Sequence, residues 1–78
     1  VTNIHEASSH MQVYPNPFEN ALHVRVDNQH KVRLVDACGR VIISENVGYL
    51  ARWDVSNLTS GVYFLLVGER SFKLLKVH

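Results

Sequence analysis

The sequence predicts an all-β fold, a small antiparallel β-sandwich. Its apolar residues occur in short runs rich in Val, Leu, Ile, Phe and Tyr, and Gly, Asn and Pro separate these runs at regular intervals. No stretch shows the apolar spacing of an amphipathic helix, which recurs about every 3.6 residues. The chain has 78 residues, which is enough for one domain with a modest core.

The expected strands are short and follow one another closely. In chain order they cover residues 11–14, 22–27, 32–35, 40–44, 49–55, 62–67 and 72–77. Strict alternation in 22–27 places Leu22, Val24 and Val26 on the core side. We expect turns at 28–30 and 36–39 to produce two successive hairpins, that is, a meander. About seven strands are typical of an immunoglobulin-like sandwich.

The later strands carry the strongest core candidates. Alternation in 49–55 selects four residues for the buried side, Tyr49, Ala51, Trp53 and Val55. Trp53 is the largest of these and the expected core anchor. The almost continuously apolar run 62–67 favours a central strand covered on both faces, and 68–71 returns the chain to its last strand.

The domain boundary and composition restrict the function. Residues 1–10 have the composition of a linker, so the folded domain is expected at 11–78. A formal net charge of +1 with scattered basic residues argues against a nucleic-acid partner. Cys38 is the only cysteine, so no internal disulfide can form. No apolar run approaches the roughly 20 residues that span a bilayer.

Residue patterns of catalysis and of metal binding are missing from the sequence. The five histidines show no short-range pairing of the kind that metal sites use. Neither a Gly-x-Ser-x-Gly elbow nor a glycine-rich phosphate loop is present. We therefore expect no enzymatic activity, no metal and no cofactor.

The segment Pro15-Asn16-Pro17-Phe18 is expected to form a stiff entry into the fold, because each proline fixes its own φ angle and restricts the residue before it. One interpretation is a rigid turn whose aromatic residue caps the core. The alternative is a recognition edge that presents Phe18 and the prolines. Turn prolines are the more common case, and this favours the first interpretation.

Two glycine motifs are expected to shape the fold. Gly61 and Tyr63 resemble a tyrosine corner, in which the Tyr hydroxyl bonds to the backbone upstream. Gly39 is expected to close a hairpin at positive φ. Arg40 follows it and has two possible roles, an ion pair with Asp36 across the hairpin or a docking charge for a partner.

The last strand also allows two interpretations. Lys73 and Lys76 stand in an apolar setting, where Lys73 can face solvent and protect a sheet edge against unwanted pairing. An edge strand equally offers backbone N–H and C=O groups for strand addition by another protein. Unpaired edges also predict that the isolated domain forms a homodimer or swaps its terminal strand.

These motifs, taken in order, resemble the type A C-terminal sorting domains of type IX secretion cargo. The residues that carry the resemblance are 13–18, 22–24, 35–41, 53–65 and 72–76. The resemblance covers about 13–77, nearly all of the expected fold. The sequence departs from the family pattern at Cys38, where a small or polar residue is more usual, and at Val77-His78, which follow the usual terminal Lys.

The resemblance implies that the domain directs an upstream cargo from the periplasm across the outer membrane of a Gram-negative cell. It further implies that a surface sortase removes the domain by cutting in or before 1–10, so that the cargo ends at the cell surface, commonly on anionic lipopolysaccharide, or outside the cell. The residues expected to meet the translocon are Arg40, Lys73, Leu74, Leu75, Lys76 and Val77. The residues expected to shape the fold are Pro15, Asn16, Pro17, Phe18, Gly39, Gly61 and Tyr63.

Two other functions remain open from the sequence. The chain could be an immunoglobulin-like accessory module that binds carbohydrate or protein for a secreted enzyme or an adhesin. A stand-alone enzyme would need a pocket with convergent polar groups, which the residue pattern does not predict.

Overall fold

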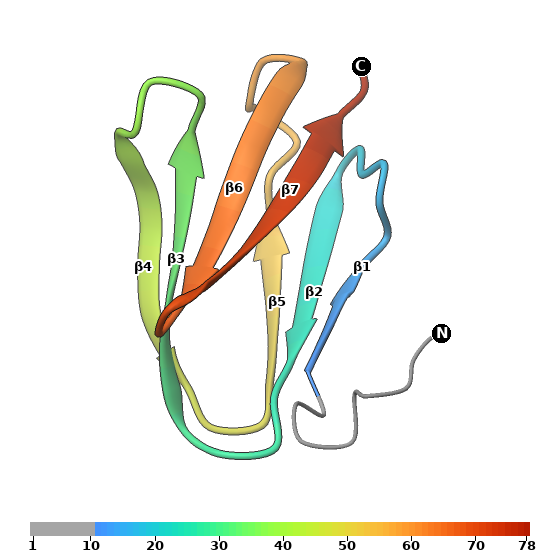
Figure 1. Ribbon diagram of the computed structural model, residues 1–78. Coiled ribbons are helices and arrows are strands. Elements are labelled where there is room, and N and C mark those ends of the chain that lie inside the picture. The colour runs from blue at the N-terminus through green and yellow to red at the C-terminus, as the bar shows by residue number, and fades with distance from the viewer. Residues whose placement is uncertain (1–10) are drawn as a thin grey trace.

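The computed structural model describes residues 11–78, which form two antiparallel sheets packed face to face (Figure 1). The strands are β1 (Gln12–Tyr14), β2 (Ala21–Arg25), β3 (His30–Asp36), β4 (Val41–Val47), β5 (Leu50–Asp54), β6 (Gly61–Val67) and β7 (Arg70–Lys76). One sheet has the order β1-β2-β5 and the other β4-β3-β6-β7. The predicted all-β sandwich of about seven strands is thus confirmed.

The connection between β2 and β3 differs from the expected hairpin. β2 pairs with β1 and β5, whereas β3 pairs with β4 and β6, so the residues between them cross from one sheet to the other. Val26 continues the inward alternation of β2 and is 1% exposed, and its N–H donates to the carbonyl of Tyr49 at 2.8 Å. These contacts hold the end of β2 beside β5. The prediction of two successive hairpins was therefore wrong, since of these two turns only the one between β3 and β4 closes a hairpin.

The position of β4 distinguishes this sandwich from the constant-type immunoglobulin arrangement. In that arrangement the fourth strand lies in the sheet of the first, second and fifth strands. Here the tight β3–β4 turn keeps β4 beside β3, with a register shift between Leu34 and Val35. The result is a four-stranded sheet with β6 near its middle.

The core between the sheets comes mainly from alternate residues of the strands. Leu22, Val24 and Val26 are all buried, as alternation predicts. Trp53 is 6% exposed, and its indole N–H donates to Glu45 Oε1 at 2.7 Å. Because Trp53 lies on β5 and Glu45 on β4, this bond ties one sheet to the other.

Tyr49 does not occupy the buried position that alternation predicts. It is 60% exposed because it precedes β5, where the side chain turns outward to Arg25. Arg25 Nη2 donates to Tyr49 Oη at 2.9 Å, and the guanidinium carbon lies 5.3 Å from the ring centroid. Ala51, Trp53 and Val55 follow the predicted pattern.

β6 lies between β3 and β7, but only one of its faces is covered. Tyr63, Leu65 and Val67 point into the core, whereas Val62, Phe64 and Leu66 are half-buried on the other side. The expected cover on both faces was therefore wrong, because no layer of the described chain packs on the outside of this sheet.

The predicted tyrosine corner is present. Tyr63 Oη donates to the carbonyl of Thr59 at 2.7 Å. Gly61 has φ +146°, which side chains rarely tolerate, so glycine suits this corner. Phe18 packs edge to face on Tyr63 with ring centroids 6.0 Å apart, and it is 0% exposed. Phe18 therefore belongs to the core, as the rigid-turn interpretation predicts.

Candidate functional site

The last strand, β7, alternates between the core and the surface. Leu74 is 2% exposed and Lys76 is 1% exposed, so both side chains lie inside the sandwich. Leu75 is 43% exposed, Lys73 is exposed and Val77 is half-buried. Among the β7 residues expected to meet the translocon, Lys73 and Leu75 are thus the two with exposed side chains.

Lys76 is the one buried charged or polar residue among those described. Its Nζ donates to the carbonyl of the next residue, Val77, at 3.3 Å. The salt bridges found in the described chain do not involve it. Burial of an ammonium group costs free energy unless hydrogen bonds or a carboxylate compensate for the lost water.

The outer edge of β7 is partly covered by the segment that enters the fold. Asn16 Nδ2 donates to the Lys73 carbonyl at 3.2 Å, and the Leu75 N–H donates to Asn16 Oδ1 at 3.1 Å. Phe18 continues this pairing through its N–H to the Leu75 carbonyl and its carbonyl to the Val77 N–H, both 2.9 Å. The edge that the sequence predicts to be open is therefore paired over its C-terminal half.

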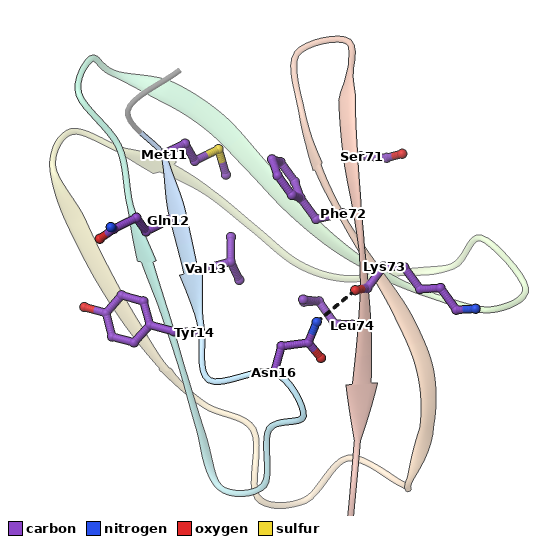
Figure 2. A pocket seen from close by; sticks show the side chains of 9 residues that line it. All are labelled: Met11, Gln12, Val13, Tyr14, Asn16, Ser71, Phe72, Lys73 and Leu74. Atoms are coloured by element: carbon purple, nitrogen blue, oxygen red, sulfur yellow. Dashed lines mark hydrogen bonds between the residues drawn. The ribbon is translucent and has the colours of Figure 1, made fainter. Parts of the chain in front are cut away.

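A groove remains between β1 and the N-terminal half of β7 (Figure 2). Its lining residues are Met11, Gln12, Val13, Tyr14, Asn16, Ser71, Phe72, Lys73 and Leu74. Asn16 closes one end through its bond to the Lys73 carbonyl. The Lys73 ammonium points away from the groove, toward the outside of the four-stranded sheet (Figure 2). The groove is thus a seam between two sheet edges that is lined by both polar and apolar side chains.

The β3–β4 turn places Arg40 at the end of the four-stranded sheet where β7 also finishes (Figure 1). Arg40 Nε lies 3.2 Å from Asp36 Oδ2, and the Arg40 side chain is 79% exposed. The ion pair expected from the sequence is therefore present, and the guanidinium stays accessible. Gly39 has φ +89°, the positive value expected for this turn.

Asp36 organises that turn through its carboxylate. Its Oδ1 accepts hydrogen bonds from the backbone N–H groups of Arg40 and Cys38, each at 2.9 Å. The Arg40 N–H is the largest cause that lowers the pKa of Asp36 below its ordinary 3.8, and the Cys38 N–H and the Arg40 charge act in the same direction. A carboxylate that stays ionised keeps the hairpin closed.

The described residues form neither a metal site nor a membrane-spanning helix. Within residues 11–78, no three of the His, Cys, Asp and Glu side chains lie close enough together to hold a metal ion. No helix of the described chain is long and apolar enough to cross a membrane.

The structure separates the residues expected at the recognition site into groups. Lys73 and Leu75 share the outside of the four-stranded sheet, whereas Leu74 and Lys76 lie in the core. Arg40 is separated from β7 by β3 and β6. The contacts of Asn16 with residues 57 and 59 positions away could not be found from the sequence, because no local pattern signals a contact over that distance.

Comparison with known proteins gives one match. No curated protein and no solved structure was found to match the chain. A family model described as a secretion system C-terminal sorting domain matches residues 12–76, from the start of β1 to the end of β7. The family is one of sorting signals and is not an enzyme family. The chain therefore belongs to the C-terminal sorting domains of the type IX secretion system.

Proposed function

We propose that this domain carries an upstream cargo through the outer-membrane translocon of the type IX system and that a surface sortase then removes it. Membership of the family itself implies a sorting signal that serves export to the outer membrane or the cell surface. The observation that carries the proposal is the family match over 12–76, which includes every strand of the sandwich. The whole fold, rather than a terminal peptide, is then the unit that the export machinery recognises.

Within this proposal, the translocon first contacts the exposed part of the expected recognition set. Lys73 and Leu75 are available on the folded domain, and Arg40 is accessible at the same end of the sheet. Leu74 and Lys76 take part only if β7 leaves the core, because both are nearly fully buried. Val77 is half-buried and its N–H donates to the Phe18 carbonyl, so it too becomes fully available only when β7 leaves the core.

The experiment that tests this proposal is an export assay. Residues 11–78 are fused behind a periplasmic reporter in a strain that has the type IX system, and surface reporter is quantified. We expect the intact domain to support export and deletion of 71–78 to abolish it. A reporter that stays in the periplasm with the intact domain contradicts the proposal.

Because that deletion also removes most of β7, a folded variant is needed beside it. Lys73→Glu with Leu75→Glu changes only exposed side chains of β7. Arg52→Glu with Leu50→Glu is the matched control, because both positions are exposed on β5 in the other sheet. We expect the β7 variant to lose export and the control to keep it, with unchanged thermal unfolding in both. Equal export from the two variants contradicts recognition through β7.

Removal by a sortase is tested on the exported product. Mass spectrometry of surface cargo is expected to show a C-terminus in or before residues 1–10, with residues 11–78 missing. Surface cargo that still carries the intact domain contradicts removal and favours an accessory module that stays attached.

A further inference from the structure

The outside of the four-stranded sheet has an unusual composition for a surface that faces solvent. Directly paired residues of neighbouring strands point to the same side of a sheet, so the register defines this surface. We call it the outer face. Its members are Lys31, Arg33, Val35, Val41, Ser44, Asn46, Val62, Phe64, Leu66, Ser71, Lys73 and Leu75. An antiparallel sheet with one solvated face normally carries polar residues there.

Apolar side chains form a continuous patch across the outer face. One row of paired residues runs from Val41 through Val35 and Phe64 to Lys73, and Val62 pairs with Leu75 beside it. Val41 is 50% exposed and Leu75 is 43% exposed, so the patch is open to solvent. Contiguous apolar patches of this kind mark interaction surfaces more often than single exposed residues do.

Val35 shows how closely this patch packs. It is 6% exposed although it is not part of the core cluster between the sheets. Its paired neighbours on the outer face, Val41 and Phe64, therefore cover it. The apolar patch is thus already formed in the folded domain, and no other part of the described chain packs on it.

The charges of the outer face all have one sign. Lys31, Arg33 and Lys73 stand beside the apolar patch, and no outer-face position carries a carboxylate. The salt bridges of the described chain do not involve these three cations. Two copies of this face would bring like charges together, which disfavours a homodimer through it. An acidic partner complements it.

We propose that the outer face binds a protein surface that combines exposed carboxylates with apolar side chains, and that this surface belongs to the export machinery. The identity of the partner rests on the proposed function, whereas its chemistry rests on the outer face itself. A lipid surface fits less well, because the half-buried Phe64 and the short Val41 and Leu75 cannot reach far into an acyl layer.

The chemistry is tested by NMR with a copolymer of glutamate and tyrosine as the binding partner. We expect the copolymer to shift the backbone amide signals of Arg33, Phe64 and Lys73 and to leave β2 and β5 unshifted. Poly-glutamate is the control for charge alone and should bind more weakly. Vesicles of phosphatidylglycerol represent the lipid alternative. Shifts centred on β2 and β5, or tighter binding to the vesicles than to the copolymer, overturn the inference.

A charge-reversal pair connects this surface with export. Arg33→Glu with Lys73→Glu should weaken copolymer binding at least about tenfold and reduce export by a similar factor, because like charges then face an acidic partner. Arg25→Glu with Arg52→Glu is the matched control, with the same change in net charge on the other sheet. Its binding and export should stay within about twofold of the unchanged domain.

The outcomes separate the two proposals. Unchanged export by Arg33→Glu with Lys73→Glu, while the unchanged domain is exported, overturns the outer face as a docking surface and leaves the sorting function standing. Specific copolymer binding by a domain that fails to export its reporter supports the chemistry of the outer face and contradicts the sorting function.

Discussion

The outward surfaces of the two sheets differ in the contacts that their side chains make with one another. On the three-stranded sheet, Tyr14 stacks on His23 with ring centroids 5.0 Å apart, and Arg25 bonds to Tyr49. On the four-stranded sheet, the outer face exposes Val41 and Leu75 beside cations without ion-pair partners in the described chain. The three-stranded sheet also exposes Leu50, but its outward charges have both signs because Asp54 lies there with Arg25 and Arg52. The outer face instead combines its apolar patch with charges of one sign. This difference supports our proposal that a partner binds the four-stranded sheet.

The largest expected effect comes from Phe18, which lies beneath both surfaces. Phe18→Ala removes a fully buried ring and its contact with Tyr63, and should lower the free energy of unfolding by about 3–5 kcal/mol. Because a small single domain normally unfolds in one cooperative transition, both sheets should unfold together in a urea titration. Tyr14→Ala, at an exposed aromatic position, is the control. A four-stranded sheet that persists alone would show that the two surfaces belong to separate folding units.

A substitution of Lys76 tests the comparison, because its buried ammonium group is expected to lower the stability of the sheet that contains β7. Lys76→Met keeps the chain length and removes the charge, so the free energy of unfolding should rise by about 1 kcal/mol or more. Hydrogen exchange should slow in β6 and β7 before it changes in β2 and β5. Lys73→Met, at an exposed position of the same strand, is the control. Destabilisation by Lys76→Met would mean that the ammonium contributes more than its one hydrogen bond indicates.

Asn16 is expected to have a smaller and more local effect. Asn16→Ala deletes the two bonds to the edge of β7 and should lower the free energy of unfolding by about 1 kcal/mol. The Leu75 amide should exchange faster, while the neighbouring Leu74 amide, which faces β6, should not. Asn20→Ala in the same connection is the comparison variant. Unchanged exchange at Leu75 would show that Phe18 alone holds this edge.

The smallest expected effect is that of acid on the two turns that carboxylates organise. Asp36 holds the turn between β3 and β4 in the four-stranded sheet, and Asp54 holds the turn that follows β5 in the three-stranded sheet. The pKa of each is lowered, and hydrogen bonds from Ser56 are the main cause at Asp54. Both pKa values are depressed by folding, so the stability from these groups is present above about pH 4 and is lost as the pH falls through the lower folded-state values. Thermal unfolding between pH 2 and 6 checks this. Asp36→Asn and Asp54→Asn should each flatten the acid limb, and an unchanged limb would contradict the role of that carboxylate.

Local pattern predicts most of this fold, and its failures have physical causes. Alternation places Leu22, Val24 and Trp53 correctly because each lies within a strand. It fails at Tyr49, where the strand has not yet begun and Arg25 draws the ring outward. A short polar link looks the same whether it closes a hairpin or crosses between sheets, so the path from β2 to β3 could not be predicted.

The candidate site was predictable only in part. The sequence indicates that Lys73 can face solvent in the last strand, but it cannot show that Lys73 lies beside Phe64 and Leu75 beside Val62. Those neighbours are set by strand order, which depends on contacts between distant residues. The burial of Lys76 also could not be predicted, since lysine is rarely found in a core.

The carboxamide of Asn16 has a consequence for contacts between copies of the domain. Its N–H group donates to β7 and its carbonyl oxygen accepts from β7. The side-chain amide therefore makes the two hydrogen bonds that a residue of a neighbouring strand would make. Asn16 and Phe18 together cover the C-terminal half of the free edge of β7, so the edge stays unpaired only along the N-terminal half of this strand. A second copy of the domain therefore finds less free edge with which to form a shared sheet. One side chain thus reduces the edge that is open to aggregation.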